Sequence, residues 1–156
     1  PLQGLTDFIF RNSFNKFFKG LDSTYSPFIR IEKGEIRRSK LRDVESELNK
    51  GSNLVPQILT NDKEEFLFLA NMLTDMGYQE INWNLGCPFP MLARHNLGSG
   101  MLKEFKNIDE MLTNILPKIA CKLSLKIRSG YENETDLLEL LPLLEKHDLI
   151  HGGKFP

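Results

Sequence analysis

The sequence lacks the features that mark a secreted, membrane-bound or metal-binding protein. Its 156 residues include only two cysteines and three histidines, and these do not have the spacing of metal ligands. There is no signal-like N-terminus, no internal repeat and no long apolar run, and the net charge is only −1. We therefore expect a cytoplasmic protein with no metal and no membrane partner, which contacts nucleic acid only through a local surface.

The motifs of several common enzyme classes are also missing. The chain has no paired-carboxylate motif, no Ser-His-Asp order, no GxGxxG and no Walker loop. The sequence therefore gives no support to hydrolysis or to nucleoside triphosphate chemistry.

The apolar content, 40%, suffices for the core of one domain. Period-two alternation and short apolar runs predict strands at 25–29, 55–59, 81–84 and 122–128. Residues 1–4 are a strand end or a turn, and residues 149–151 are a last apolar fragment. Capping residues and helical periodicity predict helices at 6–20, 39–49, 62–77, 107–119 and 134–146. This alternation, roughly six βα units or parts of them, indicates a parallel sheet.

Two of the predicted helices carry distinctive side chains. The first has four aromatic residues at helical spacing, which we expect to be core: Phe10, Phe14, Phe17 and Phe18. The segment before and within the second has four basic residues, which contact phosphate or, as we favour, lie on a solvated helical face: Arg37, Arg38, Lys40 and Arg42.

The strands favour a barrel over a doubly wound sheet. A doubly wound sheet buries both strand faces, so its central strands read as continuous apolar runs. Here one face of each strand is apolar and the other carries polar residues such as Gln57, Asn84 and Lys126, as a barrel mouth requires. We predict an α/β fold of the TIM type, incomplete because eight units take about 250 residues.

Residues 81–90 place two amide side chains and a thiol at the end of one predicted strand. The strand with Asn82 and Asn84 stops at Gly86, and Cys87 follows it, where parallel α/β folds keep their sites. By position alone, the thiol is equally consistent with a reactive and an inert cysteine. Lys126 and His151 fall at other C-terminal strand ends, and although each has a structural explanation, their convergence favours a lined pocket.

Four motifs in the same order resemble the flavin-dependent tRNA-dihydrouridine synthases. Asn84-Leu85-Gly86-Cys87-Pro88, with Gly98 and Leu102 downstream, is similar to the family signature. Residues 1–7 with Phe10-Arg11 resemble its opening Pro-Met-x-Gly-Val-Thr-Asp-x-x-Phe-Arg, and residues 125–130 resemble Val-Lys-Ile-Arg-x-Gly. Gln57 stands at the position of the glutamine in the third strand of the family.

The resemblance implies a barrel that holds FMN, uses NADPH as reductant and saturates the C5–C6 bond of uridines in tRNA. It implies that Cys87 gives a proton to C5, a task for which an unperturbed thiol is mostly protonated at neutral pH. It assigns Asn84 to the uracil and Arg128 to tRNA phosphate. The residues that it assigns to FMN are Pro1, Leu2, Gln3, Gln57, Lys126 and His151.

The sequence departs from the family in three places. Met91-Leu92 replace a basic residue before Val, and residues 151–154 only partly match a His-x-Arg motif. Nothing corresponds to the last two barrel strands, where a phosphate site is expected, or to the C-terminal helical tRNA-binding domain. Both ends look cut, so we expect residues 1–156 to be a partial FMN-binding barrel domain, from an enzyme that is monomeric when intact.

Two alternatives remain at this point. The first is another FMN barrel that acts on a pyrimidine, similar to a dihydroorotate dehydrogenase. The second is a non-catalytic fragment that does not retain flavin and associates through an unpaired strand edge.

Overall fold

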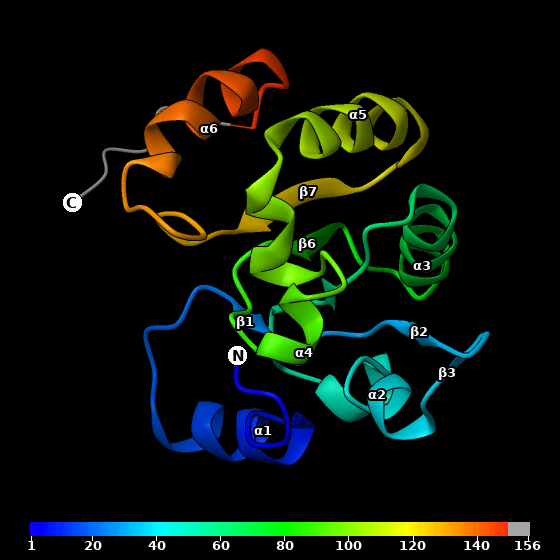
Figure 1. Ribbon diagram of the computed structural model, residues 1–156. Helices are drawn as coiled ribbons and strands as arrows, with labels where there is room; N and C mark the ends of the chain where they lie inside the picture. Colours follow the sequence, from blue (N-terminus) through cyan, green and yellow to red (C-terminus); the bar gives the residue numbers. More distant parts are fainter. Residues whose placement is uncertain (150–156) are drawn as a thin grey trace.

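The computed structural model of the protein describes residues 1–149 (Figure 1). Its centre is a set of parallel strands that follow one another in chain order. β1 (Thr24–Tyr25) pairs with β4 (Leu54–Val55), and β5 (Gln57–Ile58), β6 (Glu80–Asn84) and β7 (Lys122–Lys126) form a three-stranded sheet. An Ile29–Ile58 bridge continues the pairing beyond β1. The expected α/β fold with parallel strands is confirmed for the described residues.

Pro56 separates β4 from β5 because proline has no N–H to donate to the ladder. Its carbonyl still accepts a hydrogen bond from the Asn82 amide at 2.8 Å, so the two short strands act as one interrupted strand. β6 agrees with the predicted strand within one residue, whereas β7 ends two residues before the predicted limit.

Helices connect the strands. The longer ones are α1 (Phe8–Phe17), α3 (Lys63–Asp75), α5 (Phe105–Ile115) and α6 (Asp136–Lys146). The short elements are the hairpin β2 (Ile31–Glu32) and β3 (Glu35–Ile36), the helices α2 (Arg38–Arg42) and α4 (Pro90–Ala93), and the 3₁₀ turns η1 (Ser46–Asn49), η2 (Gly98–Lys103) and η3 (Leu116–Lys118). None of the described helices has the length and apolarity needed to cross a bilayer.

Two of the helix predictions are wrong in their limits. The single helix expected at 39–49 is divided into α2 and η1, because the buried Asp43 between them turns its carboxylate to the Phe8 amide of α1, 3.0 Å away. Helix α5 starts before the expected Asn107 cap, and the Asn107 side chain donates instead to the Glu104 carboxylate. The cap of α3 is as expected, since Asp62 Oδ1 accepts from the amides of Glu64 and Glu65.

The main core lies between the sheet and the helices α3 and α5, which lie side by side (Figure 1). Phe66 of α3 meets Trp83 of β6 edge to face, with ring centroids 5.7 Å apart. Leu112 and Ile115 of α5 are fully buried in the same cluster. The predicted stripes of these two helices therefore do form the core.

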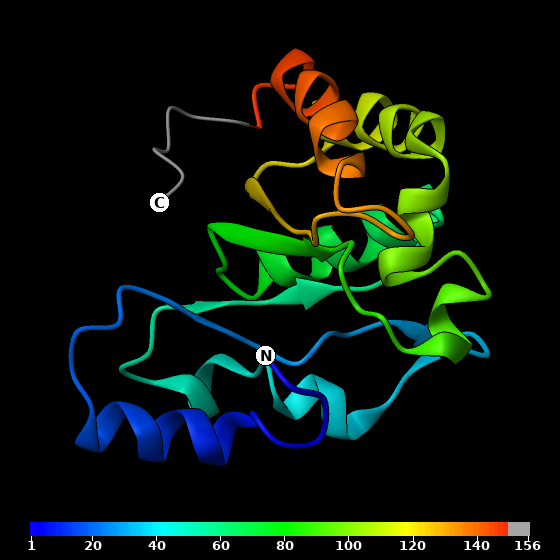
Figure 2. The same cartoon turned by 60° about the vertical axis from the view of Figure 1, so that its left-hand side comes forward.

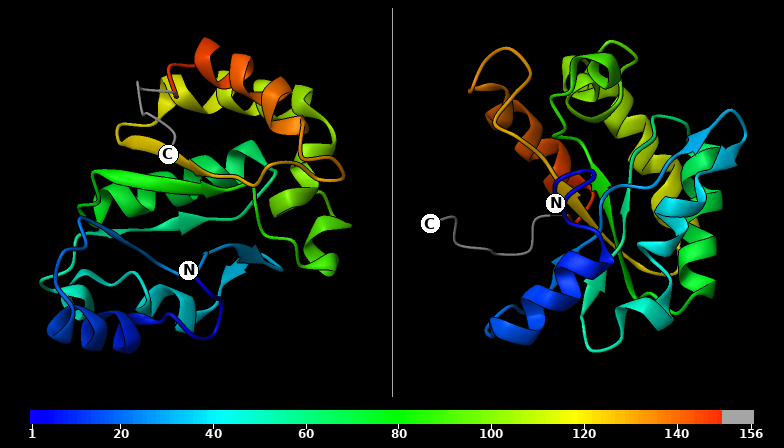
Figure 3. Two further views of the ribbon diagram at one scale, coloured as in Figure 1. Left: turned by 90° about the vertical axis from the view of Figure 1, so that its left-hand side faces the viewer. Right: turned by 90° about the horizontal axis from the view of Figure 1, so that it is seen from below.

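Helix α1 contradicts the expectation that its aromatic stripe is core. Figures 1 and 2 show it at the margin of the molecule on the β1 side, and Figure 3 shows it apart from α3 and α5. Phe17 is 74% exposed and Phe18 is 60% exposed, and Phe14 stacks on Phe18 at 4.6 Å. The buried residue of the helix is Arg11, because its guanidinium finds three oxygen acceptors on the inner side.

Candidate active site

Buried amide side chains line one face of the sheet. The parallel register puts Gln57 beside Asn82 and Asn82 beside Ser124. Gln57 Nε2 donates to Asn82 Oδ1 at 2.7 Å, and Asn82 Nδ2 donates to Ser124 Oγ at 3.0 Å. Asn84 Nδ2 donates to Gln57 Oε1 at 2.7 Å. We call these four side chains the amide chain, and it ties three strands together on their polar face.

The opposite face of β6 is apolar, because side chains alternate along a strand. Ile81 and Trp83 are fully buried there, and Trp83 Nε1 donates to the Thr60 carbonyl at 2.9 Å. The predicted division of this strand into one apolar and one polar face is therefore confirmed. The polar face is also buried, because its amides satisfy one another.

Cys87 lies on the loop directly after β6 and is half-buried. Asn84 Oδ1 accepts hydrogen bonds from the Gly86 amide at 3.1 Å and from the Cys87 amide at 2.9 Å. On the other side of the loop, the Ser99 amide donates to the Cys87 carbonyl at 3.0 Å. The backbone of Cys87 is thus held at both its N–H and its C=O.

The N-terminal turn approaches the same part of the molecule. Pro1, Leu2 and Gln3 are exposed, and the turn closes when the amides of Leu5 and Thr6 donate to the Leu2 carbonyl. Figures 1 and 3 show the N-terminus beside the central strands. Lys126 is opposite Asn84 in the register of β6 and β7.

The structure thus brings together most of the predicted site: the N-terminal turn, Gln57, Asn84, Lys126 and the Cys87 loop. Arg128 is exposed, two residues beyond the end of β7, and makes none of these contacts. His151 lies outside the described residues. Sequence reasoning left Asn82 as structural and gave Ser124 no role, although the alternation of their strands places both on the polar face.

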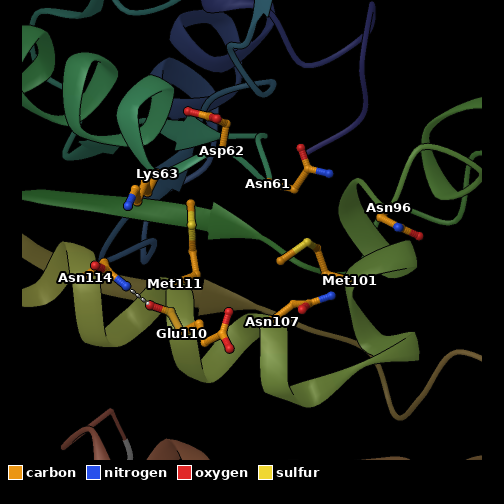
Figure 4. Close-up of a pocket in the computed structure, with 9 residues that line it drawn as sticks. All are labelled: Asn61, Asp62, Lys63, Asn96, Met101, Asn107, Glu110, Met111 and Asn114. Carbon is orange, nitrogen blue, oxygen red and sulfur yellow. Dashed lines mark hydrogen bonds between the residues drawn. The ribbon is translucent and has the colours of Figure 1, made fainter.

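A separate hollow of about 360 Å³ lies between the start of α3 and α5. Figure 4 shows its lining, which includes Met101 and Met111 and none of the predicted site residues. Two of its asparagines already have partners: Asn61 donates to the His95 carbonyl, and Asn114 donates to the Glu110 carbonyl. In the described part of the chain, no three His, Cys, Asp or Glu side chains group to hold a metal ion.

A half-buried thiol at the C-terminal end of a parallel strand, beside amides and a lysine, defines an enzyme-like site of the parallel α/β class. The chain belongs to the dihydrouridine synthase (Dus) family, whose family model matches residues 1–147.

Curated relatives agree with this family. The chain is 28% identical over 147 residues to tRNA-dihydrouridine(16) synthase of Neisseria meningitidis serogroup A, an alignment that covers 89% of this chain and 44% of the relative. It is 29% identical over 157 aligned positions to tRNA-dihydrouridine synthase B of Klebsiella pneumoniae, which covers 97% of this chain and 48% of the relative. The corresponding protein of Pasteurella multocida is 27% identical, with 97% and 47% covered. The chain therefore spans less than half the length of these relatives.

Proposed function

We propose that the protein is a flavin-dependent tRNA-dihydrouridine synthase and that this chain supplies the proton-donating side of its catalytic barrel. The observation that carries the proposal is Cys87, half-buried on the loop after β6 and held by its backbone beside the polar face of the sheet. Family membership favours this reading over the dihydroorotate dehydrogenase type. We propose that the reaction takes place in the cytoplasm, where tRNA is present.

The donor groups on the polar face suit FMN. Gln57 Nε2 and Asn84 Nδ2 each use one hydrogen within the amide chain, and an amide nitrogen has two. Gln57 is fully buried, whereas Lys126 is half-buried, so the Lys126 ammonium is the accessible donor that fits the acceptors on the polar edge of an isoalloxazine ring. The second hydrogen of Asn84 is kept for the uracil. When bound, FMN would take a hydride from NADPH and supply it to uracil C6.

The remaining cofactor contacts are proposed by resemblance. The turn of Pro1, Leu2 and Gln3 would pack against the ring, and its exposure leaves it free to do so. His151 would complete the FMN site.

Cys87 would supply the second hydrogen atom of the product. Its S–H bond breaks as a new C–H bond forms at uracil C5, while the hydride reaches C6, so the two additions together saturate the double bond. The thiolate that remains would recover its proton from water. Because the thiol makes no hydrogen bond within residues 1–149, its proton is free to point toward a substrate.

Asn84 and Arg128 would act on the tRNA. A uridine in a folded tRNA has to leave its stack before C5 and C6 can be reached, and an amide can hold the edge of the flipped base. Arg128 is exposed near the same end of β7 and would contact a phosphate.

We also propose that residues 1–156 are part of a (β/α) barrel that further strands and a helical tRNA-binding domain complete. The exposed aromatic face of α1 supports this, because an apolar helix face of this kind normally packs on another element.

The test compares two thiols in the full-length protein. Cys87→Ala should abolish formation of dihydrouridine, measured by mass spectrometry of digested tRNA, and leave reduction of the flavin by NADPH intact. Cys121→Ala is the matched control, since Cys121 is also half-buried but precedes β7, at the opposite end of the parallel sheet. Native tRNA turnover in Cys87→Ala would show that Cys87 is not the proton donor.

Two further measurements separate the alternatives. Reduction of a free pyrimidine in preference to tRNA would favour the dihydroorotate dehydrogenase type. A purified 156-residue chain without a flavin absorption band would favour the fragment that binds no cofactor.

A further inference from the structure

The oxygen of Asn84 is fully used by the loop that carries the thiol. Asn84 is only 4% exposed, and its Oδ1 takes the amide hydrogens of both Gly86 and Cys87. This is an Asx turn, in which a side chain fixes the direction of the backbone two and three residues later. The orientation of Cys87 at its N–H therefore depends on Asn84.

Gly98 packs closely against Cys87 on the other side of the loop. Its φ is +58°, and a Cβ added at this residue would lie 2.8 Å from the Cys87 carbonyl oxygen and 2.9 Å from the Cys87 Cβ. Both distances are shorter than van der Waals contact, and the second involves the carbon that carries the sulfur. The neighbouring Ser99 amide adds its hydrogen bond to the same carbonyl. Nothing larger than glycine fits there without moving Cys87.

Asn84 is itself held in place by the amide chain. Its Nδ2 is bound to Gln57, whose own amide is bound to Asn82, which reaches Ser124 on β7. All three amide residues are buried, so a rotation of Asn84 would leave polar groups without partners. The position of the Cys87 loop is thus fixed through three neighbouring strands.

We propose that Asn84 and Gly98 are positioning residues that clamp Cys87 from its two sides and so determine where its thiol points. This deepens the proposed function and rests on Cys87 as the proton donor. A general acid has to lie within hydrogen-bond reach of the atom that it protonates. A displacement of about 1 Å at a reacting group can lower the rate about 100-fold, so contacts that fix the position of Cys87 would raise the rate of proton transfer.

The test measures the thiol itself and needs no turnover. Iodoacetamide alkylates Cys87 and Cys121 in the same molecule, and mass spectrometry gives the ratio of the two rates. In Asn84→Ala and Gly98→Ala we expect this ratio to change several-fold, whereas general loosening of the fold would speed both thiols together. An unchanged ratio in both variants would overturn the proposal.

Asn84→Asp is the variant that should rescue the position. A carboxylate still accepts from the Gly86 and Cys87 amides, and the amides of Gln57 and Asn82 can both turn over so that the chain runs in the opposite direction. We expect this variant to keep the slow hydrogen exchange at the Cys87 amide that Asn84→Ala should lose. Hydrogen exchange is the readout here, because the added negative charge disfavours the Cys87 thiolate and slows its alkylation whatever the position of the loop. If Asn84→Ala does not fold, Asn84→Asp still tests the clamp, because fast hydrogen exchange at its Cys87 amide would contradict the proposal.

Asn61→Ala is the matched control for the loop. Asn61 is an exposed asparagine that donates to the His95 carbonyl, at the far side of the same loop, and does not touch Cys87. Its loss should leave the alkylation ratio unchanged; a change as large as that in Asn84→Ala would show that any loop contact has this effect.

Half-reactions in the full-length protein connect the clamp to catalysis. Gly98→Ala is the variant for this test, because Gly98 is assigned no contact with cofactor or substrate. In Gly98→Ala, oxidation of the reduced enzyme by tRNA should slow by about 10- to 100-fold, while flavin reduction by NADPH stays near native. The two proposals can fail separately. Native tRNA reduction by Cys87→Ala would refute the role of Cys87 as proton donor, and the clamp would still stand if the alkylation ratio is altered. An unaltered alkylation ratio would refute the clamp alone.

Discussion

Globular proteins usually bury apolar side chains and expose polar ones, and two regions of this molecule depart from that rule: the end of β6 and the helix α1. Around β6 three amides are buried, with exposures between 0% and 4%, and each is hydrogen-bonded. On α1 the buried residue is an arginine, and Phe10, Phe17 and Phe18 are exposed. Polar residues are inside in one region and aromatic residues are outside in the other.

In both regions, whether a side chain is buried depends on the hydrogen-bond or packing partners around it rather than on its residue type. Amides can be buried at β6 because the parallel register places complementary donors and acceptors side by side. Arg11 is buried because carbonyl and amide oxygens surround its guanidinium. Phe10, Phe17 and Phe18 stay exposed within residues 1–149, which indicates a surface that contacts another element.

The largest expected effect contrasts Trp83 with Phe17. Trp83→Ala removes a fully buried ring that packs on Phe66 and should lower the free energy of unfolding by about 3–5 kcal/mol. Phe17→Ala removes an exposed ring and should change it by less than about 0.5 kcal/mol. Urea denaturation followed by circular dichroism measures both. A large loss in Phe17→Ala would mean that a second copy or another segment covers α1 in solution.

Arg11 should be the next most costly residue to replace. Arg11→Met leaves the Thr6 carbonyl and the Asn49 side-chain oxygen without the guanidinium donor, and leaves the Asp43 carbonyl only its longer bond from Asn49. It should lower the free energy of unfolding by about 2–3 kcal/mol. Arg42→Met is the control, because Arg42 is exposed and its guanidinium only stacks on the Phe8 ring at 5.2 Å. Denaturation midpoints that agree for the two variants would show that Arg11 contributes no more than a surface cation.

The amide chain should contribute somewhat less. Gln57→Leu leaves Asn82 Oδ1 and Asn84 Nδ2 buried without their present partner, which should cost about 1–3 kcal/mol. Gln79→Leu, at an exposed glutamine, should change stability by less than about 0.5 kcal/mol. Equal thermal midpoints for Gln57→Leu and the native protein would mean that the buried amides are no better than apolar packing.

The smallest effect is a pH dependence at Asp109, which joins α5 to α6. Its carboxylate accepts from Lys146 Nζ at 2.8 Å and lies 2.6 Å from His147 Nε2. Lys146 and then His147 lower its pKa below the ordinary value of 3.8. This contribution to stability is therefore present above pH 3.8 and is lost as the pH falls through the lower pKa of the folded state.

Hydrogen exchange of the α6 amides tests this dependence. Exchange in the native protein should show a further loss of protection below pH 3.8, beyond the loss seen in Asp109→Asn, which has no carboxylate to titrate. Identical pH profiles for the two proteins would show that the three side chains do not stabilise the docking of α6.

The sequence predicted the buried faces of β6 and α3 correctly and that of α1 wrongly. The alternation of Ile81, Asn82, Trp83 and Asn84 predicted a strand with two unlike faces, and the structure has this strand. The spacing of Phe66, Leu69 and Leu73 predicted the buried side of α3. The same kind of spacing predicted a buried aromatic stripe on α1 and was wrong, since periodicity shows that a face exists but not what covers it.

The order of the longer strands and helices, the polar residues at the strand ends and the family resemblance could all be read from the sequence, and the comparison with known proteins confirms the resemblance. These are local properties, read from neighbouring residues along one chain. The β2–β3 hairpin was not predicted. Three features became visible in the folded chain alone: Gln57, Asn82 and Ser124 form one chain of hydrogen bonds, Arg11 is buried, and a Cβ at residue 98 would collide with Cys87. The physical reason is that each of these contacts joins residues distant in sequence, through a register and a loop path that local patterns do not encode.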